Sequence, residues 1–271
     1  MRNKIFIAID TKSQKRAMSI IKNSKMDNFK IGYKFGLEFL NSKNGRKFIS
    51  KLKNKIIFLD LKLHDIPNTV SSALLALKDL KINYLTVHIS SGLKALKKLK
   101  NEIIFADLKL HDIPNTCVSA IKAIQDLKIN YLTIHISSGI RALKAAKKVT
   151  NKIKLIGVTI LTSLDNKALK EIGFNKNVKK LVLHQARLAS KAKLDAIVCS
   201  AEEVRLVKKV FKKEIITPGI RIDKKSSDDQ KRVLTPKQAY DNGSDWLVIG
   251  RLITKGNVKK NIQTLVHHLN Q

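Results

Sequence analysis

The chain has 271 residues, 44% of them hydrophobic, and its 54 basic and 21 acidic residues give a formal net charge of +33. This length and hydrophobic content are typical of a packed soluble protein with a sizeable core. The charge alone would suit a nucleic-acid partner, but the lysines are spread evenly along helix-like segments and only 5% of residues are aromatic. We therefore expect no nucleic-acid partner, and a positive field that favours an anionic substrate.

Neither a membrane span nor a secretory signal is predicted. The apolar run near the start is too short for a signal peptide, and no run approaches the roughly 20 apolar residues of a membrane helix. Cys117 and Cys199 lack the spacing of a disulfide framework or a metal site. We expect a cytoplasmic protein with reduced thiols and no membrane contact.

Short β-branched runs alternate with amphipathic helical stretches along the chain. Each run is nearly continuous in apolar residues, as in a strand buried on both faces. This alternation indicates a parallel sheet, and so many strands favour one α/β domain over 1–271 with the architecture of a (β/α)8 TIM barrel. The predicted strands are IFIAI (5–9), FKIGYKF (29–35), IIFLDLKL (56–63), YLTVHI (84–89), IIFADLKL (103–110), YLTIHI (131–136), KLIGVTIL (154–161), AIVCS (196–200), EIITPGI (214–220) and WLVIG (246–250).

Ten predicted strands exceed the eight of such a barrel, and an internal duplication accounts for the excess. Residues 51–97 and 98–144 align without a gap and are roughly three quarters identical. We interpret them as tandem copies of one strand-helix-strand-helix unit. Eight strands can close the barrel with either copy outside it or with strands from both copies, and we favour the first copy because it continues directly from the preceding helix. A ten-stranded barrel is the least expected, because it would widen a packed interior.

The repeated run DLKLHDIPNT carries the charged residues that point to chemistry. Asp60 and Lys62 share one face of a strand, because side chains alternate with a period of two, and Asp65 follows where the chain turns into a helix. Thr69 is a plausible N-cap of that helix. Charges at the end of so apolar a strand need partners, and the C-terminal ends of barrel strands form the active-site face, so we favour chemistry over a structural ion pair. The second copy offers Asp107, Lys109, Asp112 and Thr116 for the same roles.

Other candidates follow other predicted strands. Asp10 ends the first strand, Lys34 lies in the second, and Thr162 follows the KLIGV run. A barrel phosphate site is commonly built after the last two strands, where glycine exposes backbone N–H groups and arginine binds phosphate with two donors. The candidates for this site are Arg221, Gln230, Gly250 and Arg251.

The motifs together resemble those of orotidine 5′-phosphate decarboxylases. The resemblance rests on FLDLKLHDIPNT, GVTILTSL, VCSAEE, TPGIR, DDQKRVLTP and VIGRLIT in that order, and it covers essentially the whole chain apart from the extra copy. It implies decarboxylation of orotidine monophosphate to uridine monophosphate, without cofactor or metal, in a homodimer whose sites lie at the interface. The duplication departs from the family pattern.

The resemblance also implies roles for individual residues. Lys62 would protonate C6 of the pyrimidine as carbon dioxide leaves, with Asp60 against the substrate carboxylate and Lys34 bridging the ribose and the charges. Asp65 would reach the site of a second subunit. The substrate-binding set would be Asp10 for the ribose, Thr162 for the base, Arg221, Gln230, Gly250 and Arg251 for the phosphate, with Lys34, Thr69 and Thr116 beside them.

Two alternatives stay open. A sugar-phosphate decarboxylase or hexulose-phosphate synthase shares the Asp-x-Lys-x-x-Asp strand but generally needs a metal, and LHDIPNT with TPGIR argues against it. The duplication could also have destroyed the site and left a basic binding protein, which salt-sensitive retention on nucleic acid without turnover would indicate.

Overall fold

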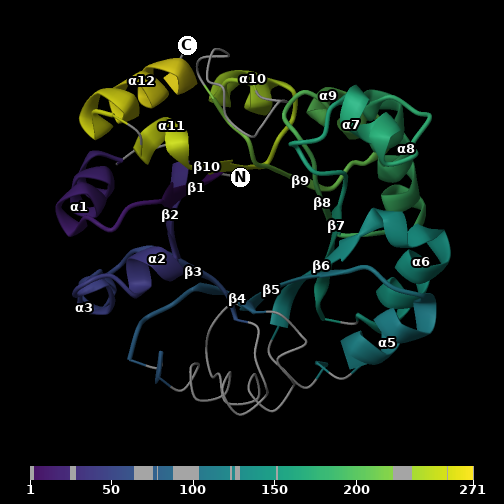
Figure 1. Cartoon of the computed structure of the whole chain (residues 1–271), viewed down its shortest axis with the longest axis horizontal. Helices are drawn as coiled ribbons and strands as arrows, with labels where there is room; N and C mark the ends of the chain where they lie inside the picture. Colours follow the sequence, from purple (N-terminus) through teal and green to yellow (C-terminus); the bar gives the residue numbers. More distant parts are fainter. Residues whose placement is uncertain are drawn as a thin grey trace.

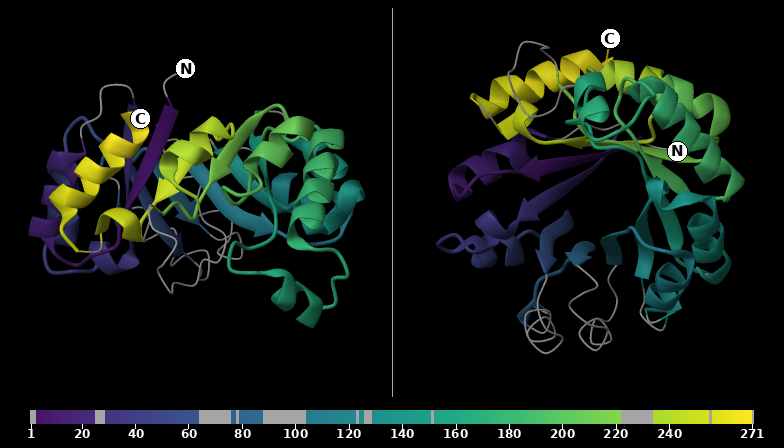
Figure 2. Two further views of the ribbon diagram at one scale, coloured as in Figure 1. Left: turned by 90° about the horizontal axis from the view of Figure 1, so that it is seen from above. Right: turned by 45° about the vertical axis from the view of Figure 1, so that its right-hand side comes forward.

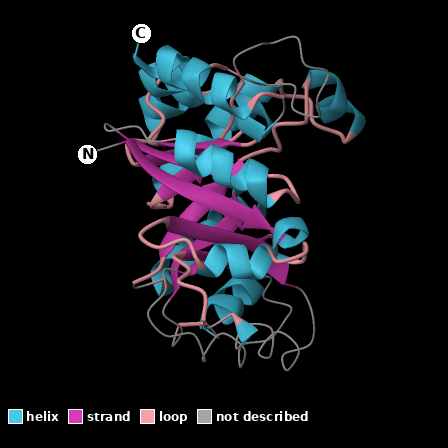
Figure 3. Cartoon of the chain, turned by 90° about the vertical axis from the view of Figure 1, so that its left-hand side faces the viewer, coloured by secondary structure: helices cyan, strands magenta, loops and turns pink. Residues whose placement is uncertain are grey.

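The computed structural model describes residues 3–24, 29–63, 76–77, 79–87, 104–122, 124–125, 129–150, 152–221, 234–254 and 256–270. Ten parallel strands form one sheet that curls into a nearly closed barrel, with helices around the outside (Figures 1 and 3). The strands are β1 (Asn3–Ile9), β2 (Phe29–Gly36), β3 (Ile56–Leu63), β4 (Tyr84–Val87), β5 (Ile104–Leu110), β6 (Ile129–His135), β7 (Lys154–Val158), β8 (Ala196–Val198), β9 (Glu214–Thr217) and β10 (Trp246–Ile249).

All ten strands predicted from the apolar runs are confirmed. Their hydrogen-bonded order is β4-β3-β2-β1-β10-β9-β8-β7-β6-β5. The two end strands of this order, β4 and β5, lie side by side and bring the ring close to closure (Figure 1). The barrel architecture expected from the sequence is therefore present, with two strands more than expected.

Helices pack on the outer face of the ring (Figure 2). Some of their N-termini are capped by side chains; for example, the Asp165 and Asn177 side chains each accept a hydrogen bond from a backbone N–H in the first turn. The helices are α1 (Gln14–Asn23), α2 (Leu37–Leu40), α3 (Gly45–Ser50), α5 (Pro114–Lys122), α6 (Gly139–Val149), α7 (Asn166–Glu171), α8 (Val178–Lys191), α9 (Val204–Val210), α10 (Pro236–Asp241), α11 (Arg251–Thr254) and α12 (Val258–Asn270). Within the described ranges, no helix has the length and apolar character needed to cross a bilayer.

The expectation that one copy lies outside an eight-stranded barrel is wrong. The first copy supplies β3 and β4, the second supplies β5 and β6, and all four strands belong to the same sheet. The segment that carries the aspartate and lysine of the motif has the same irregularity in both copies. The strand register shifts between Leu59 and Leu63 in the first copy and between Ala106 and Leu110 in the second. The copies thus occupy equivalent positions in the ring.

Aromatic side chains explain how a ten-stranded ring keeps a packed interior. Each copy brings an aromatic pair into the lumen, Phe58 with Tyr84 and Phe105 with Tyr131. The Phe58 and Phe105 rings are in contact across the two copies, with their centroids 6.0 Å apart. The duplication therefore adds lumen-filling side chains together with the strands that widen the lumen.

Candidate active site

The two aspartates of the repeated run lie at the mouth of the barrel. Asp60 is near the C-terminal end of β3, on the same strand face as Phe58, and Asp107 is near the end of β5, on the same face as Phe105. Both carboxylates therefore stand above the aromatic layer, at the end of the lumen where the active sites of parallel barrels are found.

In the first copy, the carboxylate of Asp60 accepts hydrogen bonds from side chains of both neighbouring strands. The Lys34 ammonium, from β2, donates to Oδ2 in an ion pair whose side chains are 21% and 12% exposed. The Thr86 hydroxyl, from β4, donates to Oδ1 over 2.9 Å. Because the pair is largely shielded from water, its charges interact more strongly than those of a surface salt bridge.

In the second copy, Asp107 takes its lysine from its own strand. The Lys109 ammonium donates to Oδ2 of Asp107, and the Thr133 hydroxyl of β6 donates to Oδ1 over 3.0 Å. Lys109 has a left-handed backbone, with φ of 46°. The predicted proximity of the aspartate and lysine of the motif is confirmed here by direct contact.

Strand order explains why the two aspartates have different lysine partners. On its β2 side, β3 faces Lys34, whose register partner is Phe58. On the corresponding side of β5 lies β4, which places Tyr84 and Thr86 toward the lumen. The second copy thus has β4 where the first has β2, and Asp107 binds Lys109 instead.

Two histidines stand next to the second aspartate. The rings of His111 and His135 are 5.2 Å apart, and the Ser137 hydroxyl is 3.3 Å from Nε2 of His111. Burial, together with the neighbouring His111 and Lys109, lowers the pKa of His135 below 6.5, although Asp107 opposes this. These surroundings favour the neutral form of the His135 imidazole.

Two predicted substrate-binding residues come together beside β1. Asp10 directly follows this strand and Gly250 directly follows β10, with which β1 is paired. A Cβ atom on Gly250 would lie 3.1 Å from Oδ2 of Asp10, so the backbone at this position is open only because the residue is glycine. Arg251 begins α11 at the same edge.

The surroundings of Arg221 differ from those of an arginine whose side chain is exposed to solvent for phosphate binding. It follows a turn in which Gly219 has φ of 77°, a conformation that favours glycine. Its side chain is buried, with Nη1 donating to the Ile220 carbonyl over 2.9 Å, and its backbone N–H donates to the Leu234 carbonyl.

The other predicted residues lie in the segments that follow β5 and β7, or are described only in part or not at all. Asp112 and Thr116 are exposed at the beginning of α5, where Thr116 is in the first turn, and Thr162 is half-buried in the turn after β7. For Lys62 and Arg251 the structure describes the backbone only. Asp65, Thr69 and Gln230 lie outside the described residues.

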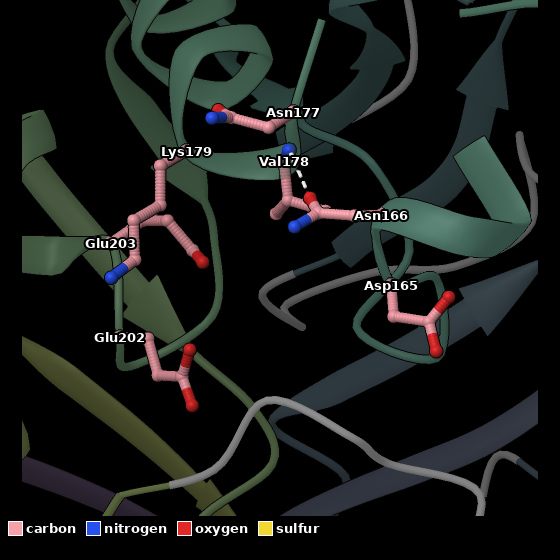
Figure 4. A pocket seen from close by; sticks show the side chains of 7 residues that line it. All are labelled: Asp165, Asn166, Asn177, Val178, Lys179, Glu202 and Glu203. Atoms are coloured by element: carbon pink, nitrogen blue, oxygen red, sulfur yellow. Dashed lines mark hydrogen bonds between the residues drawn. The ribbon is translucent and has the colours of Figure 1, made fainter. Parts of the chain in front are cut away.

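A pocket lies near these loops but does not coincide with the predicted site. Its lining comes from the segments after β7 and β8 (Figure 4), and the structure uses some of these side chains to fix helix ends. The Asn166 side chain, for example, accepts from the Val178 N–H over 2.9 Å, which ties the beginning of α7 to that of α8. The lining residues are Asp165, Asn166, Asn177, Val178, Lys179, Glu202 and Glu203.

Sequence reasoning missed Thr86, Thr133 and the lumen position of His135. A signal was available for the threonines, since each is a polar residue two positions after the tyrosine of an apolar run, on the same strand face. The mouth as a whole places fixed ammonium groups and carboxylates around one opening. Such an arrangement can stabilise a negative charge that develops on a bound substrate, with little reorganisation.

Comparison with known proteins shows the family to which the chain belongs. The sequence model described as the orotidine 5′-phosphate decarboxylase / HUMPS family matches residues 3–103 and 93–262. The chain belongs to this family. Proteins named orotidine 5′-phosphate decarboxylase are 43% identical over 97% of both chains in Wolbachia sp. subsp. Brugia malayi, and 46% identical over 93% of this chain and 90% of the relative in Coxiella burnetii.

The fold also agrees with a solved structure. A crystal structure of orotidine 5′-phosphate decarboxylase from Lactobacillus acidophilus is similar with a TM-score of 0.50 and 24% identity, over 99% of this chain and all of the other. This similarity supports the fold alone. The sequence relatives are those that bear on the chemistry.

Proposed function

We propose that this protein is an orotidine 5′-phosphate decarboxylase, a carboxy-lyase that converts orotidine monophosphate to uridine monophosphate and carbon dioxide. The proposal is supported by the decarboxylase names of relatives that align over nearly the whole chain. The structural observation that carries it is the shielded Lys34–Asp60 ion pair at the barrel mouth. A sugar-phosphate decarboxylase or a non-catalytic binding protein is not favoured by these relatives.

The reaction needs a positive charge beside C6 of the pyrimidine ring. When carbon dioxide leaves, the electron pair stays on C6, and a fixed ammonium lowers the energy of that carbanion before it donates the proton. We assign proton donation to Lys62 of β3 and the contact with the departing carboxylate to Asp60. Lys34 is the third charged residue of this group. Asp10, Thr162, Arg221, Gln230, Gly250 and Arg251 are assigned to the ribose, base and phosphate.

We further propose that the first copy carries the reaction. Asp60 accepts a hydrogen bond from the ammonium of Lys34 on the neighbouring strand β2, so this copy adds a third charged residue to the aspartate and lysine of its motif. Asp107 has its own Lys109 as partner. We therefore assign the reaction to the copy whose aspartate is joined to an ammonium group of another strand, because this copy brings one more fixed positive charge to the mouth.

The test is the loss of orotidine monophosphate absorbance with purified wild type, Lys62→Ala, Lys109→Ala and the double variant. We expect Lys62→Ala to lose on the order of 10³-fold or more in kcat, and Lys109→Ala to lose much less. The reverse pattern would assign the reaction to the second copy. A folded wild-type protein without activity would overturn the decarboxylase assignment.

We propose a homodimer that pairs through the C-terminal end of the barrel. Large apolar side chains are exposed there in the segments that follow β2, β5 and β7, and Asp112 stands beside one of them. Covering them with a second chain would remove apolar area from water, and would let Asp65 or Asp112 approach the partner's site. These side chains are Leu37, Ile113, Leu161, Ile172 and Phe174. Sedimentation velocity of wild type beside Leu161→Arg tests the pairing: a wild-type monomer would contradict it.

Two organisational proposals accompany the function. We propose that residues 1–271 form one barrel domain in which 51–97 and 98–144 are tandem copies, because the two family matches overlap at 93–103 and each copy contributes two strands. We propose a cytoplasmic location, which is supported by the buried Cys117 and Cys199, neither of which forms a disulfide.

A further inference from the structure

A threonine hydroxyl orients the carboxylate in both copies of the motif. In each copy Oδ1 of the aspartate accepts a bond from a threonine of the following strand, while Oδ2 accepts from a lysine ammonium. The lysine comes from a different place in each copy, but the threonine comes from the same one. The threonine contact is therefore the constant part of the arrangement.

The second copy shows what the hydroxyl does for the backbone as well. The Thr133 Oγ1 that donates to Asp107 also accepts the Lys109 N–H over 2.8 Å. This N–H belongs to a left-handed residue in the stretch where the β5–β6 register shifts. The hydroxyl thus takes the place of a backbone carbonyl as the acceptor for this N–H between the two strands. It also connects Asp107 to the backbone of the lysine two residues later.

Both threonines are fixed by their surroundings. Thr86 and Thr133 are each 2% exposed, and each lies on a strand that is paired to the rest of the sheet. A buried hydroxyl has few other partners, and a β-branched side chain has restricted rotamers. The direction of the bond to the carboxylate is set by the sheet rather than by a mobile loop.

We propose that Thr86 is a positioning residue for the decarboxylation. It holds Oδ1 of Asp60 so that Oδ2 faces Lys34 and the carboxylate keeps one orientation toward the substrate. This inference rests on the proposed function, and on the assignment of the reaction to the first copy. Thr86 itself touches the aspartate, and acts on the reaction through it.

The experiment compares Thr86→Val, which removes the hydroxyl at nearly constant shape, with Thr86→Ser, which keeps it. Thr150→Val is the matched control, because Thr150 is also buried and its hydroxyl donates to the Lys147 carbonyl, between α6 and β7 at the opposite end of the barrel. We measure kcat and KM for orotidine monophosphate, the pH profile of kcat, and the thermal midpoint of each variant.

We expect Thr86→Val to lower kcat roughly 10- to 100-fold with a smaller change in KM, because a carboxylate that can rotate is misplaced for part of the time. The acid limb of the kcat profile should move to higher pH, because an anion that loses a donor is protonated more easily. Thr86→Ser should restore both, and Thr150→Val should leave both unchanged.

Three outcomes would overturn the inference alone, and a fourth would overturn it together with the proposed function. If the wild type is active and Thr86→Val retains its kcat and pH profile, the positioning role alone fails. If Thr86→Val loses activity only in proportion to the fall in its thermal midpoint, the hydroxyl is structural. If Thr133→Val changes kcat and Thr86→Val does not, the role belongs to the second copy. An inactive wild type would overturn the proposed function together with the inference.

Discussion

The shared lumen of the two copies predicts that equivalent aromatic residues stabilise the barrel to a similar extent. Phe58 and Phe105 occupy the same position in their copies, are both half-buried, and have ring centroids 6.0 Å apart. Truncation of a fully buried Phe to Ala costs about 3–5 kcal/mol. For half-buried rings we expect Phe58→Ala and Phe105→Ala each to lower the free energy of unfolding by about 2 kcal/mol.

The double variant measures whether the copies contact one another. We expect the two losses to be non-additive by about 0.5–1.5 kcal/mol, because one ring contact is counted in both single variants. The assay is urea unfolding followed by tryptophan fluorescence, since the single tryptophan, Trp246, stacks on Phe6 inside the same lumen. Gln263→Ala, at an exposed position of α12 outside the barrel, is the control and should change the free energy by less than about 0.5 kcal/mol.

One result would refute the reasoning. If Phe105→Ala is neutral while Phe58→Ala is costly, and the two changes are additive, then the second copy does not line the lumen. The protein would in that case be an eight-stranded barrel with an appended unit.

Two further predictions concern stability away from the mouth. The pKa of Asp195 is lowered below 3.8 by its bond to Lys147 and by a backbone N–H, which outweigh the opposing effect of burial. A lowered carboxyl pKa stabilises the fold above the ordinary value, and this contribution is lost as the pH falls through the folded value. Asp195→Asn should therefore reduce the free energy of unfolding by about 1–3 kcal/mol at pH 7, and the difference in stability from wild type should disappear below pH 3.8. Urea titrations at several pH values test this, and a stability difference that does not change with pH would contradict it. Gly45→Ala should lower the free energy of unfolding by about 1–3 kcal/mol or more, because its Cβ would lie 1.9 Å from the Phe39 carbonyl oxygen. Gly36→Ala is the control, because a Cβ there meets nothing within 4 Å, and it should leave the thermal midpoint nearly unchanged. Equal midpoints for both variants would contradict the packing described.

The sequence alone determined the strands and the position of the charged motif. Runs such as IIFLDLKL are apolar enough to be recognised as buried parallel strands without any knowledge of their neighbours, and the alternation of side chains already places Asp107 and Lys109 on one face. The family could be identified at the same stage, because its motifs are local and occur in a fixed order.

The tertiary structure decided how the two copies share the barrel. Two nearly identical segments have nearly identical local preferences, so the sequence cannot say which of them pairs with β2 and which with β7. Only the nearly closed ring shows that both copies are used and that Asp60 faces Lys34 while Asp107 binds Lys109. It also shows that Thr86 and Thr133 donate hydrogen bonds to the two carboxylates. These contacts join residues of different strands, and they depend on strand order and register rather than on local sequence.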